Sequence, residues 1–379
     1  MIPASDTRQI ASICLAYAAA GVFWGALAAS LPALQAQSGL GDGAFGIALG
    51  AMALVALPVM RIFGRHLHRI EATAIPTTMT VMAAGAAVLP VLPGLWGLLI
   101  AFAITGGASG ALDIALNART ARIESDAGVR LFNRTHAIFP AASLLTSAAT
   151  GFARGADVPL SFIFAVVTLA LLASAWLERG AGRHIMPAPG ADTPPPARLN
   201  GVLMILALIA AAAAFQEAAS QGWAAIFVER IRDAGPVLAG LAPAAYTLGL
   251  SAGRLIAHAA EVRLRGAIIL QISAIFAIIG FALIPAGLPM PLTLLAFFVA
   301  GLGTGPVEPA IFQSTAQRNP GAARGPALAA VTAVAYLGYL LSPPALGIVA
   351  QGLGFSALWG ISAGMACVIA ILALRLSRS

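Results

Sequence analysis

The sequence predicts an all-α membrane protein with twelve transmembrane helices in two six-helix bundles. Hydrophobic residues make up 60% of the 379-residue chain and charged residues only 9%, whereas a soluble domain carries about 25% charged residues. The apolar runs are about 20 residues long, which is the length of a helix that crosses a bilayer. Strands of a membrane barrel would be about half as long and would alternate in polarity. A motif repeated in the two halves of the chain indicates that the bundle is duplicated.

The repeated motif reads small-x-x-hydroxyl-small-x-x-acid. Its first copy runs from Gly106 to Asp113, and its second copy, 195 positions later, runs from Gly301 to Glu308. Small residues four apart on a helix allow a neighbouring helix to approach closely. A carboxyl within an apolar helix is costly, so it normally faces the bundle interior or a wet cavity. The two motifs are therefore expected at equivalent places in two related bundles.

The apolar runs define the expected helices in chain order. The first run, 10–34, is too long for the core of a signal peptide. Breaks between runs are marked by clusters of glycine and proline, such as 39–43 and 285–291. The remaining runs cover residues 44–60, 74–92, 96–118, 136–153, 158–177, 201–226, 237–257, 266–286, 291–315, 326–350 and 354–374.

The placement of arginine predicts the orientation. With the N-terminus in the cytoplasm, the inward loops and tails hold all but three of the 21 basic residues, as the positive-inside rule requires. Both termini are then cytoplasmic. The longest polar connection, 179–200, is predicted to be a cytoplasmic linker between a first bundle at 1–178 and a second bundle at 201–379. Because both bundles have the same orientation, they are parallel repeats.

The composition also excludes several kinds of chemistry. The chain contains no lysine, so it has neither a Walker A lysine nor a lysine to hold retinal or pyridoxal phosphate as a Schiff base. It contains no His-Glu-x-x-His and no cluster with metal-ligand spacing. We therefore expect no enzymatic activity, no cofactor and no metal. The net charge of +7 comes from arginines in short loops and does not indicate nucleic-acid binding.

Glu217 is the strongest candidate for a substrate or proton site. Counted from the start of its run, it lies beyond the middle of the membrane, toward the outside. Gln221 follows one turn later on the same face, and Trp223 lies close by. Proton coupling requires a carboxyl that binds and releases a proton inside the membrane, and this position supplies one. The alternative is a packing role, in which Glu217 is hydrogen-bonded to a neighbouring helix.

Tyr17 and Trp24 in the first run are candidates to line a binding cavity opposite Glu217. Aromatic rings stack on sugars and on planar solutes. The alternative is that they pack against other helices or anchor the helix at the membrane interface, as most aromatic residues of membrane helices do.

Asp113 and Glu308 are candidates for either a proton site or a gate. Asp113 lies about 25 Å from the outer face, in the cytoplasmic third of a core of about 30 Å, and the repeat places Glu308 at the same depth. This depth favours a gate in which each acid pairs with an arginine near the cytoplasmic face. The gating candidates are Asp113, Asn117, Glu308, Arg61, Arg65 and Arg254.

Twelve helices, a proline-bearing central linker and two parallel halves resemble the major facilitator superfamily over essentially the whole chain. Three segments resemble its bacterial fucose-permease-like branch: 110–113 followed by Asn117, Glu217 with 221–223, and 338–344. The resemblance implies a secondary transporter that moves a small solute by alternating access, with a central cavity between the halves. It also implies a monomer located in the bacterial inner membrane.

The leading hypothesis is proton-coupled transport of a small solute. The alternative is proton-antiport efflux of amphipathic compounds. The run 136–153 disfavours efflux because it lacks the Gly-Pro-x-x-Gly-Gly pattern associated with drug antiporters.

The predicted loop 61–69 lacks the acid that superfamily members usually carry there, so its arginines are not expected to pair within the loop.

Overall fold

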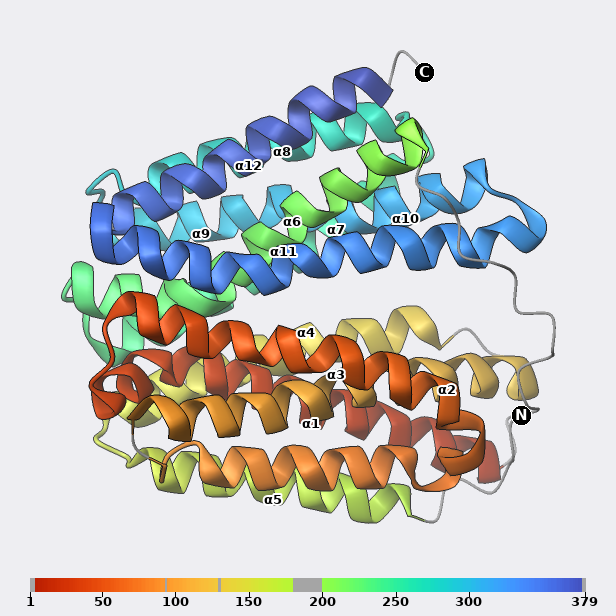
Figure 1. The fold of residues 1–379 in the computed structure, drawn as a ribbon, viewed down its shortest axis with the longest axis horizontal. Helices are drawn as coiled ribbons and strands as arrows, with labels where there is room; N and C mark the ends of the chain where they lie inside the picture. Colours follow the sequence, from red (N-terminus) through yellow and green to blue (C-terminus); the bar gives the residue numbers. More distant parts are fainter. Residues whose placement is uncertain (1–3, 93, 129–130, 180–199, 377–379) are drawn as a thin grey trace. The chain divides into compact units, whose positions relative to one another are not determined.

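The computed structural model describes residues 4–92, 94–128, 131–179 and 200–376. These residues are helical almost throughout and contain no strand (Figure 1). The predicted all-α class is therefore confirmed. The predicted linker, 179–200, falls almost entirely outside the described residues.

The helices of the first part of the chain are α1 (Ala4–Ser38), α2 (Asp42–Val88), α3 (Gly94–Ala127), α4 (Phe132–Gly155) and α5 (Leu160–Glu178). Those of the second part are α6 (Gly201–Ile226), the π-helical turn η1 (Phe227–Ile231), α7 (Gly235–Ala260), α8 (Gly266–Leu283), α9 (Met290–Thr304), α10 (Val307–Arg318), the 3₁₀ turn η2 (Gly321–Ala323), α11 (Arg324–Leu353) and α12 (Phe355–Leu376).

Nine helical segments within the described residues are long and apolar enough to cross a membrane. Every predicted apolar run falls on a helix, but runs and helices do not correspond one to one. The runs 44–60 and 74–92 share α2, and the run 291–315 is divided between α9 and α10. The count of twelve transmembrane helices therefore stays a prediction.

Helix α2 folds back on itself, so that one continuous helical segment contains two passes. A Cβ on Gly106 would lie 2.5 Å from the Cα of Met52, and a Cβ on Gly85 would lie 2.6 Å from the Cγ2 of Thr105. On a straight helix Met52 and Gly85 would be about 50 Å apart, yet both pack at the same level of α3. Figure 1 shows the orange ribbon of α2 turning back near its label.

The chain packs as two compact units. The first consists of residues 1–40, 51–191 and 235–240, and the second of residues 41–50, 192–234 and 241–379. The predicted division into bundles at 1–178 and 201–379 stays a prediction.

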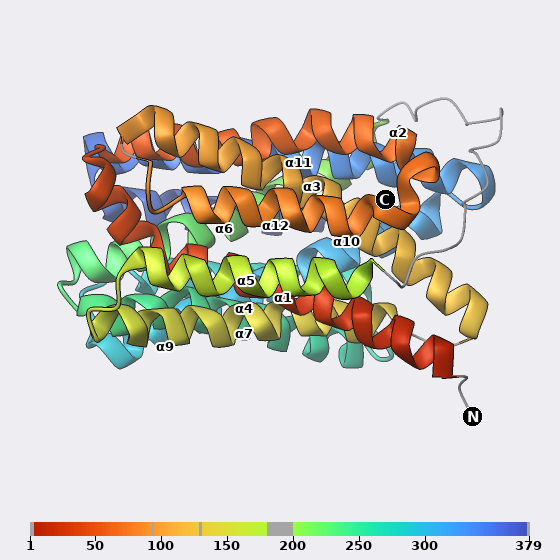
Figure 2. The same ribbon diagram turned by 90° about the horizontal axis from the view of Figure 1, so that it is seen from below.

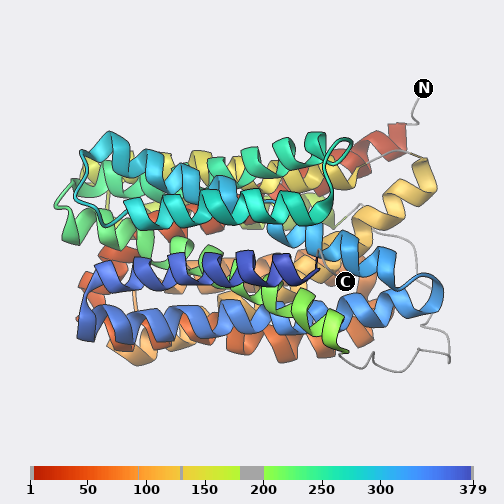
Figure 3. The ribbon, with the colours of Figure 1, turned by 90° about the horizontal axis from the view of Figure 1, so that it is seen from above.

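In the first unit, α1 packs on α3, α4 and α5. Figure 2 shows α1, α4 and α5 lying side by side. In the second unit, α6 packs on α11 and α12, while α8 packs on α9 and α12. Figure 3 shows the dark-blue α12 running beside α11. Helix α1 in the first unit and helix α6 in the second unit are thus central packing elements.

The repeated glycine motif makes a close helix contact in both units. In the first unit, a Cβ on Gly106 would lie 2.3 Å from the carbonyl oxygen of Met52 on α2. In the second unit, a Cβ on Gly301 would lie 2.1 Å from the carbonyl oxygen of Tyr246 on α7. A side chain at either position would collide with backbone, so glycine is what lets these helices touch.

A second pair of close contacts involves the first turns of α2 and of α7. In the second unit, α2 crosses α11 where a Cβ on Gly46 would lie 3.1 Å from the Cα of Gly347. In the first unit, α7 crosses α4 where a Cβ on Gly240 would lie 2.7 Å from the Cα of Gly151. The hydroxyl of Ser147 also donates to the carbonyl of Gly240 at 2.8 Å. Each unit therefore contains one crossing of two glycines next to the start of a helix.

Candidate functional site

The second unit brings together Glu217 from α6, Arg254 from α7 and Glu308 from α10. Arg254 Nη2 lies 3.9 Å from Glu217 Oε2, and the two side chains are 37% and 21% exposed. The carboxyl of Glu308 lies within electrostatic reach of both residues. The sequence favours Glu217 as a substrate or proton site and the other two as parts of a gate. The structure joins the three in one group, the Glu217–Arg254–Glu308 cluster.

Glycine residues on α7 position Arg254. Helix α7 approaches α9 so closely that Cβ atoms on Gly249 and Gly253 would lie 1.9 and 2.3 Å from backbone carbonyl oxygens of α9. Arg254 follows directly, and its Nε donates to the carbonyl of Gly305 at 3.2 Å. The guanidinium is therefore held against the junction between α9 and α10, one turn before Glu308.

The charges of the cluster do not balance. One guanidinium faces two carboxyls, so the cluster carries one excess negative charge when both carboxyls are ionised. An uncompensated charge within a membrane protein is costly. Binding of one proton, or of one cationic group, neutralises the cluster. This arrangement can take up and release a single positive charge.

Two tyrosines of α11 border the cluster. Tyr339 lies within electrostatic reach of Glu217, Glu308 and Arg254, and its ring centroid is 6.0 Å from that of Tyr336. Neither tyrosine was a candidate from the sequence. Their three-residue spacing places both on one helix face, and that signal could have found them.

Buried hydrogen bonds hold the helix face that carries Glu217. The preceding residue, Gln216, is fully buried. Its Nε2 donates to the carbonyl of Ser362 on α12 at 2.9 Å, and its Oε1 accepts from Thr304 Oγ1 on α9 at 3.4 Å. Thr304 is the hydroxyl of the second repeated motif. Since a buried amide needs its partners, these bonds fix the rotation of α6.

In the first unit, hydrogen bonds link α1 to the acidic face of α3. Tyr17 OH donates to Asn117 Oδ1 at 3.1 Å, and Asn117 Nδ2 donates to Asp113 Oδ1 at 3.1 Å. The ring centroid of His136 is 5.4 Å from that of Tyr17, and His136 is within electrostatic reach of Asp113. The structure thus joins Tyr17, expected to line a cavity, with Asp113 and Asn117, expected to form a gate.

Trp24 also contacts the repeated motif. Its Nε1 donates to Ser109 Oγ at 3.2 Å, and the Trp24 side chain is half-buried. Ser109 and Thr304 are the hydroxyls of the two motif copies, and each bonds a side chain from the first helix of its half of the sequence. In both units the motif hydroxyl thus bonds that helix, as acceptor in Ser109 and as donor in Thr304.

Two other candidates have different surroundings. Trp223 is fully buried, and its ring makes edge contacts with Phe45 at 6.3 Å and Phe355 at 5.9 Å between centroids. In this arrangement Trp223 serves packing. Gln221 is half-buried on α6.

The two gating arginines of the segment 61–69, which is helical within α2, lie on the surface. Arg61 and Arg65 are exposed, and within the described part of the chain no ion pair joins either of them to Asp113. The acid that follows this segment, Glu71, pairs with Arg122 of α3.

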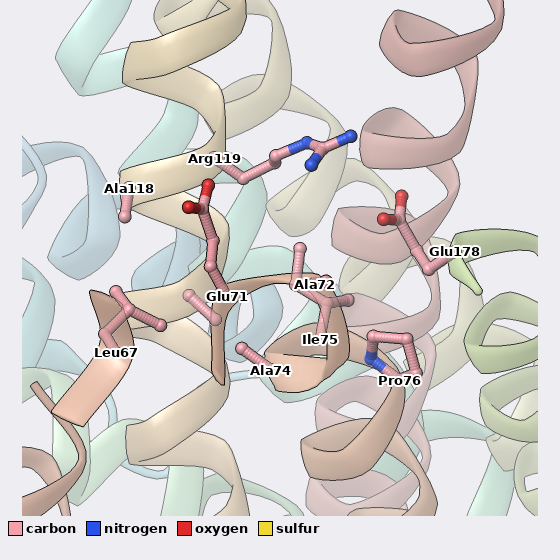
Figure 4. A pocket seen from close by; sticks show the side chains of 10 residues that line it. Leu67, Glu71, Ala72, Ala74, Ile75, Pro76, Ala118, Arg119 and Glu178 are labelled. Atoms are coloured by element: carbon pink, nitrogen blue, oxygen red, sulfur yellow. The ribbon is translucent and has the colours of Figure 1, made fainter. Parts of the chain in front are cut away.

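Near this pair, Arg119 and Glu178 line a small pocket in the first unit. Figure 4 shows the side chains of Glu71, Arg119 and Glu178 around it. Arg119 and Glu178 are almost completely buried. The group joins α2, α3 and α5 through charges of both signs, so it stabilises the packing of this unit.

Comparison with known proteins places the chain among transporters. It is 27% identical to an uncharacterised transporter, y4wD, of Sinorhizobium fredii, over 93% of this chain and 94% of that protein. It is 24% identical to an uncharacterised MFS-type transporter of Yersinia pestis, over 98% and 96% of the two chains. No protein-family model matches the chain.

Two solved structures have the same fold. The nucleoside transporter NupG matches with a TM-score of 0.79 and 13% identity, over 97% of this chain and 99% of its own. A bacterial homologue of the human lysosomal transporter Spinster matches with a TM-score of 0.73 and 13% identity, over 97% and 96%. The predicted fold is therefore confirmed, whereas the fucose-permease-like branch stays a prediction.

Proposed function

Because this chain is a membrane transporter of the major facilitator superfamily, we propose that it moves a small solute across the bacterial inner membrane by proton-coupled alternating access. It acts as a monomer with both termini in the cytoplasm. The observation that carries this proposal is the Glu217–Arg254–Glu308 cluster, in which two carboxyls share one guanidinium.

The cluster supports coupling to a proton because it exchanges one positive charge. When one carboxyl is protonated, Arg254 pairs with the carboxylate of the other. The two carboxyls belong to α6 and α10, so protonation determines which of these helices is paired with Arg254 on α7. A ligand moves an equilibrium only through a difference in its affinity for the two states, and this change of partner provides that difference.

The glycine crossings support alternating access. At the Gly46–Gly347 crossing, the two glycines place no side chain between α2 and α11, so the two backbones can separate at that point without disengaging interlocked side chains. An ion pair between Asp42 Oδ1 and Arg230 Nη1 at 2.6 Å closes the same end. We propose that these contacts hold one side of the transporter shut and are released during the cycle.

The first unit supports an uncharged polar substrate. The Tyr17–Asn117–Asp113 chain offers hydroxyl, amide and carboxyl groups, and Trp24 offers a half-buried aromatic face. Arg254 is shared by two carboxyls, so it is not available to bind an anion. Sugars and nucleosides are therefore the first compounds to test, and the name of NupG as a nucleoside transporter adds support to the second class.

The excess negative charge of the cluster supports a second function, antiport of an amphipathic cation against protons. A cationic substrate would then replace the proton at the same carboxyls. The two functions predict opposite directions of proton movement relative to the solute.

The test uses purified protein in liposomes that enclose a pH-sensitive dye, with a panel of neutral sugars, nucleosides and amphipathic cations. Glu217→Gln is compared with Glu261→Gln, the same change at the end of α7. We expect a solute-dependent pH change that Glu217→Gln abolishes and Glu261→Gln retains. Its sign separates symport from antiport. Solute flux without proton movement, unchanged in Glu217→Gln, would rule out the coupling role.

A further inference from the structure

The junction between α9 and α10 contains a carbonyl that its own helix cannot satisfy. In an α-helix each carbonyl accepts from the N–H four residues later. The residue four positions after Gly305 is Pro309, and proline has no N–H. Gly305 is buried, so water does not readily replace the missing donor, and a buried carbonyl without a donor is costly.

Arg254 supplies the donor. Its Nε donates to the Gly305 carbonyl at 3.2 Å, which leaves the two terminal nitrogens of the guanidinium for other partners. Nη2 lies 3.9 Å from Glu217 Oε2. Because the guanidinium is planar with fixed donor directions, a bond at Nε determines where the terminal nitrogens point. A lysine would have one nitrogen for both partners and no fixed donor directions.

We propose that Pro309 is a positioning residue. By removing the helix donor to the Gly305 carbonyl, it creates the acceptor that holds Arg254 between Glu217 and Glu308. This role matters for transport only if the cluster couples protons as proposed above, but the geometry itself is testable without a substrate.

The chain offers a matched control. Pro306 in the same junction likewise removes the helix donor to the carbonyl of Leu302. That carbonyl faces α7 at Gly253, where a Cβ would lie 2.3 Å from its oxygen, and Arg254 donates to the Gly305 carbonyl instead. Replacing Pro306 with alanine therefore restores an N–H to the Leu302 carbonyl and not to the Gly305 carbonyl that accepts from Arg254.

The experiment is a double-mutant cycle on the full-length protein in detergent, with the midpoint of thermal unfolding, Tm, as the readout. Arg254→Met removes every donor while keeping a long side chain. It is introduced into the wild-type, Pro309→Ala and Pro306→Ala backgrounds. Loss of the ion pair with Glu217 is common to all three backgrounds, so a difference between them reports on the Gly305 carbonyl.

We expect Arg254→Met to lower Tm by about 1–3 °C in the wild-type and Pro306→Ala backgrounds. In the Pro309→Ala background the decrease should be about half of this or less, because a backbone N–H at position 309 then serves the carbonyl. Equal decreases in the three backgrounds would overturn the inference.

The liposome assay separates this inference from the proposed function. If the decrease in Tm depends on Pro309 but the protein moves no protons, the role of Pro309 stands and the proposed function fails. If the protein moves protons but the decrease in Tm is the same in all three backgrounds, the proposed function stands and the role of Pro309 fails. If both hold, Pro309→Ala should lower the number of protons moved per solute at least about twofold, whereas Pro306→Ala should not.

Discussion

Replacing Gly347 with alanine places a methyl group where the first turns of α2 cross α11. The new Cβ would lie 2.4 Å from the carbonyl oxygen of Asp42, 3.1 Å from the Cα of Gly46 and 3.2 Å from a ring carbon of Trp223. Two of these atoms belong to the backbone and the third to a fully buried ring. No change of side-chain rotamer can therefore relieve the contact.

The size of the effect follows from these distances. Ordinary contact begins at 3.4 Å, so the Asp42 carbonyl must retreat by about 1 Å (3.4 − 2.4). Overpacking of this kind costs about 1–3 kcal/mol. If the crossing opens during transport, the same free energy favours the open form by about 5- to 150-fold.

The assay measures how fast a buried thiol is labelled. Ala48 lies in the same segment of α2 and is fully buried. Ala48→Cys is introduced after Cys14 and Cys367 are replaced by alanine, and N-ethylmaleimide labelling is followed over time. We expect Gly347→Ala to raise the labelling rate by about 5- to 150-fold. Gly364→Ala on α12, where a Cβ would meet nothing within 4 Å, should leave the rate unchanged.

Equal labelling rates in Gly347→Ala and Gly364→Ala, with both proteins unfolding cooperatively on heating, would refute this reasoning. They would mean that the crossing either does not open or is wide enough to accept a methyl group.

Two further changes test the first unit by thermal unfolding in detergent. Glu71→Gln removes the carboxylate that pairs with Arg122 and should lower the free energy of unfolding by about 1–3 kcal/mol, whereas Glu261→Gln should have little effect; equal Tm values for these two variants would contradict a stabilising role of the pair. Tyr17→Phe removes the hydroxyl that donates to Asn117 and should cost about 0.5–1.5 kcal/mol, so a Tm equal to that of the wild type would show that this bond contributes nothing.

Much of the fold could be predicted from the sequence because a bilayer leaves the backbone few choices. Without water in the hydrocarbon core, every backbone group must be satisfied within the protein, so long apolar runs can only be helices there. The same cost of polarity singles out Asp113, Glu217 and Glu308 as candidates, since a carboxyl within an apolar run needs a reason to be present. The repeat at an offset of 195 positions likewise indicated that two of these acids are equivalent.

The sequence could not show which candidates meet. Helical periodicity tells which residues share a face of one helix, but not which helix that face contacts. Arg254 lies beside Glu217 because glycines on α7 let it approach α9. Tyr339 joins the same site from α11, although no spacing links it to either residue. For the same reason Trp223 is a site candidate from the sequence, whereas in the structure its ring packs against Phe45 and Phe355.

By itself, then, the sequence determined that this protein is a duplicated bundle of membrane helices with carboxyls inside apolar helices of both halves, because hydropathy and periodicity are local properties of the chain. Tertiary structure alone decided that α2 turns back on itself and that Arg254 faces two carboxyls. Both depend on contacts between residues far apart in the chain, and such contacts are set by how closely the helix backbones can approach.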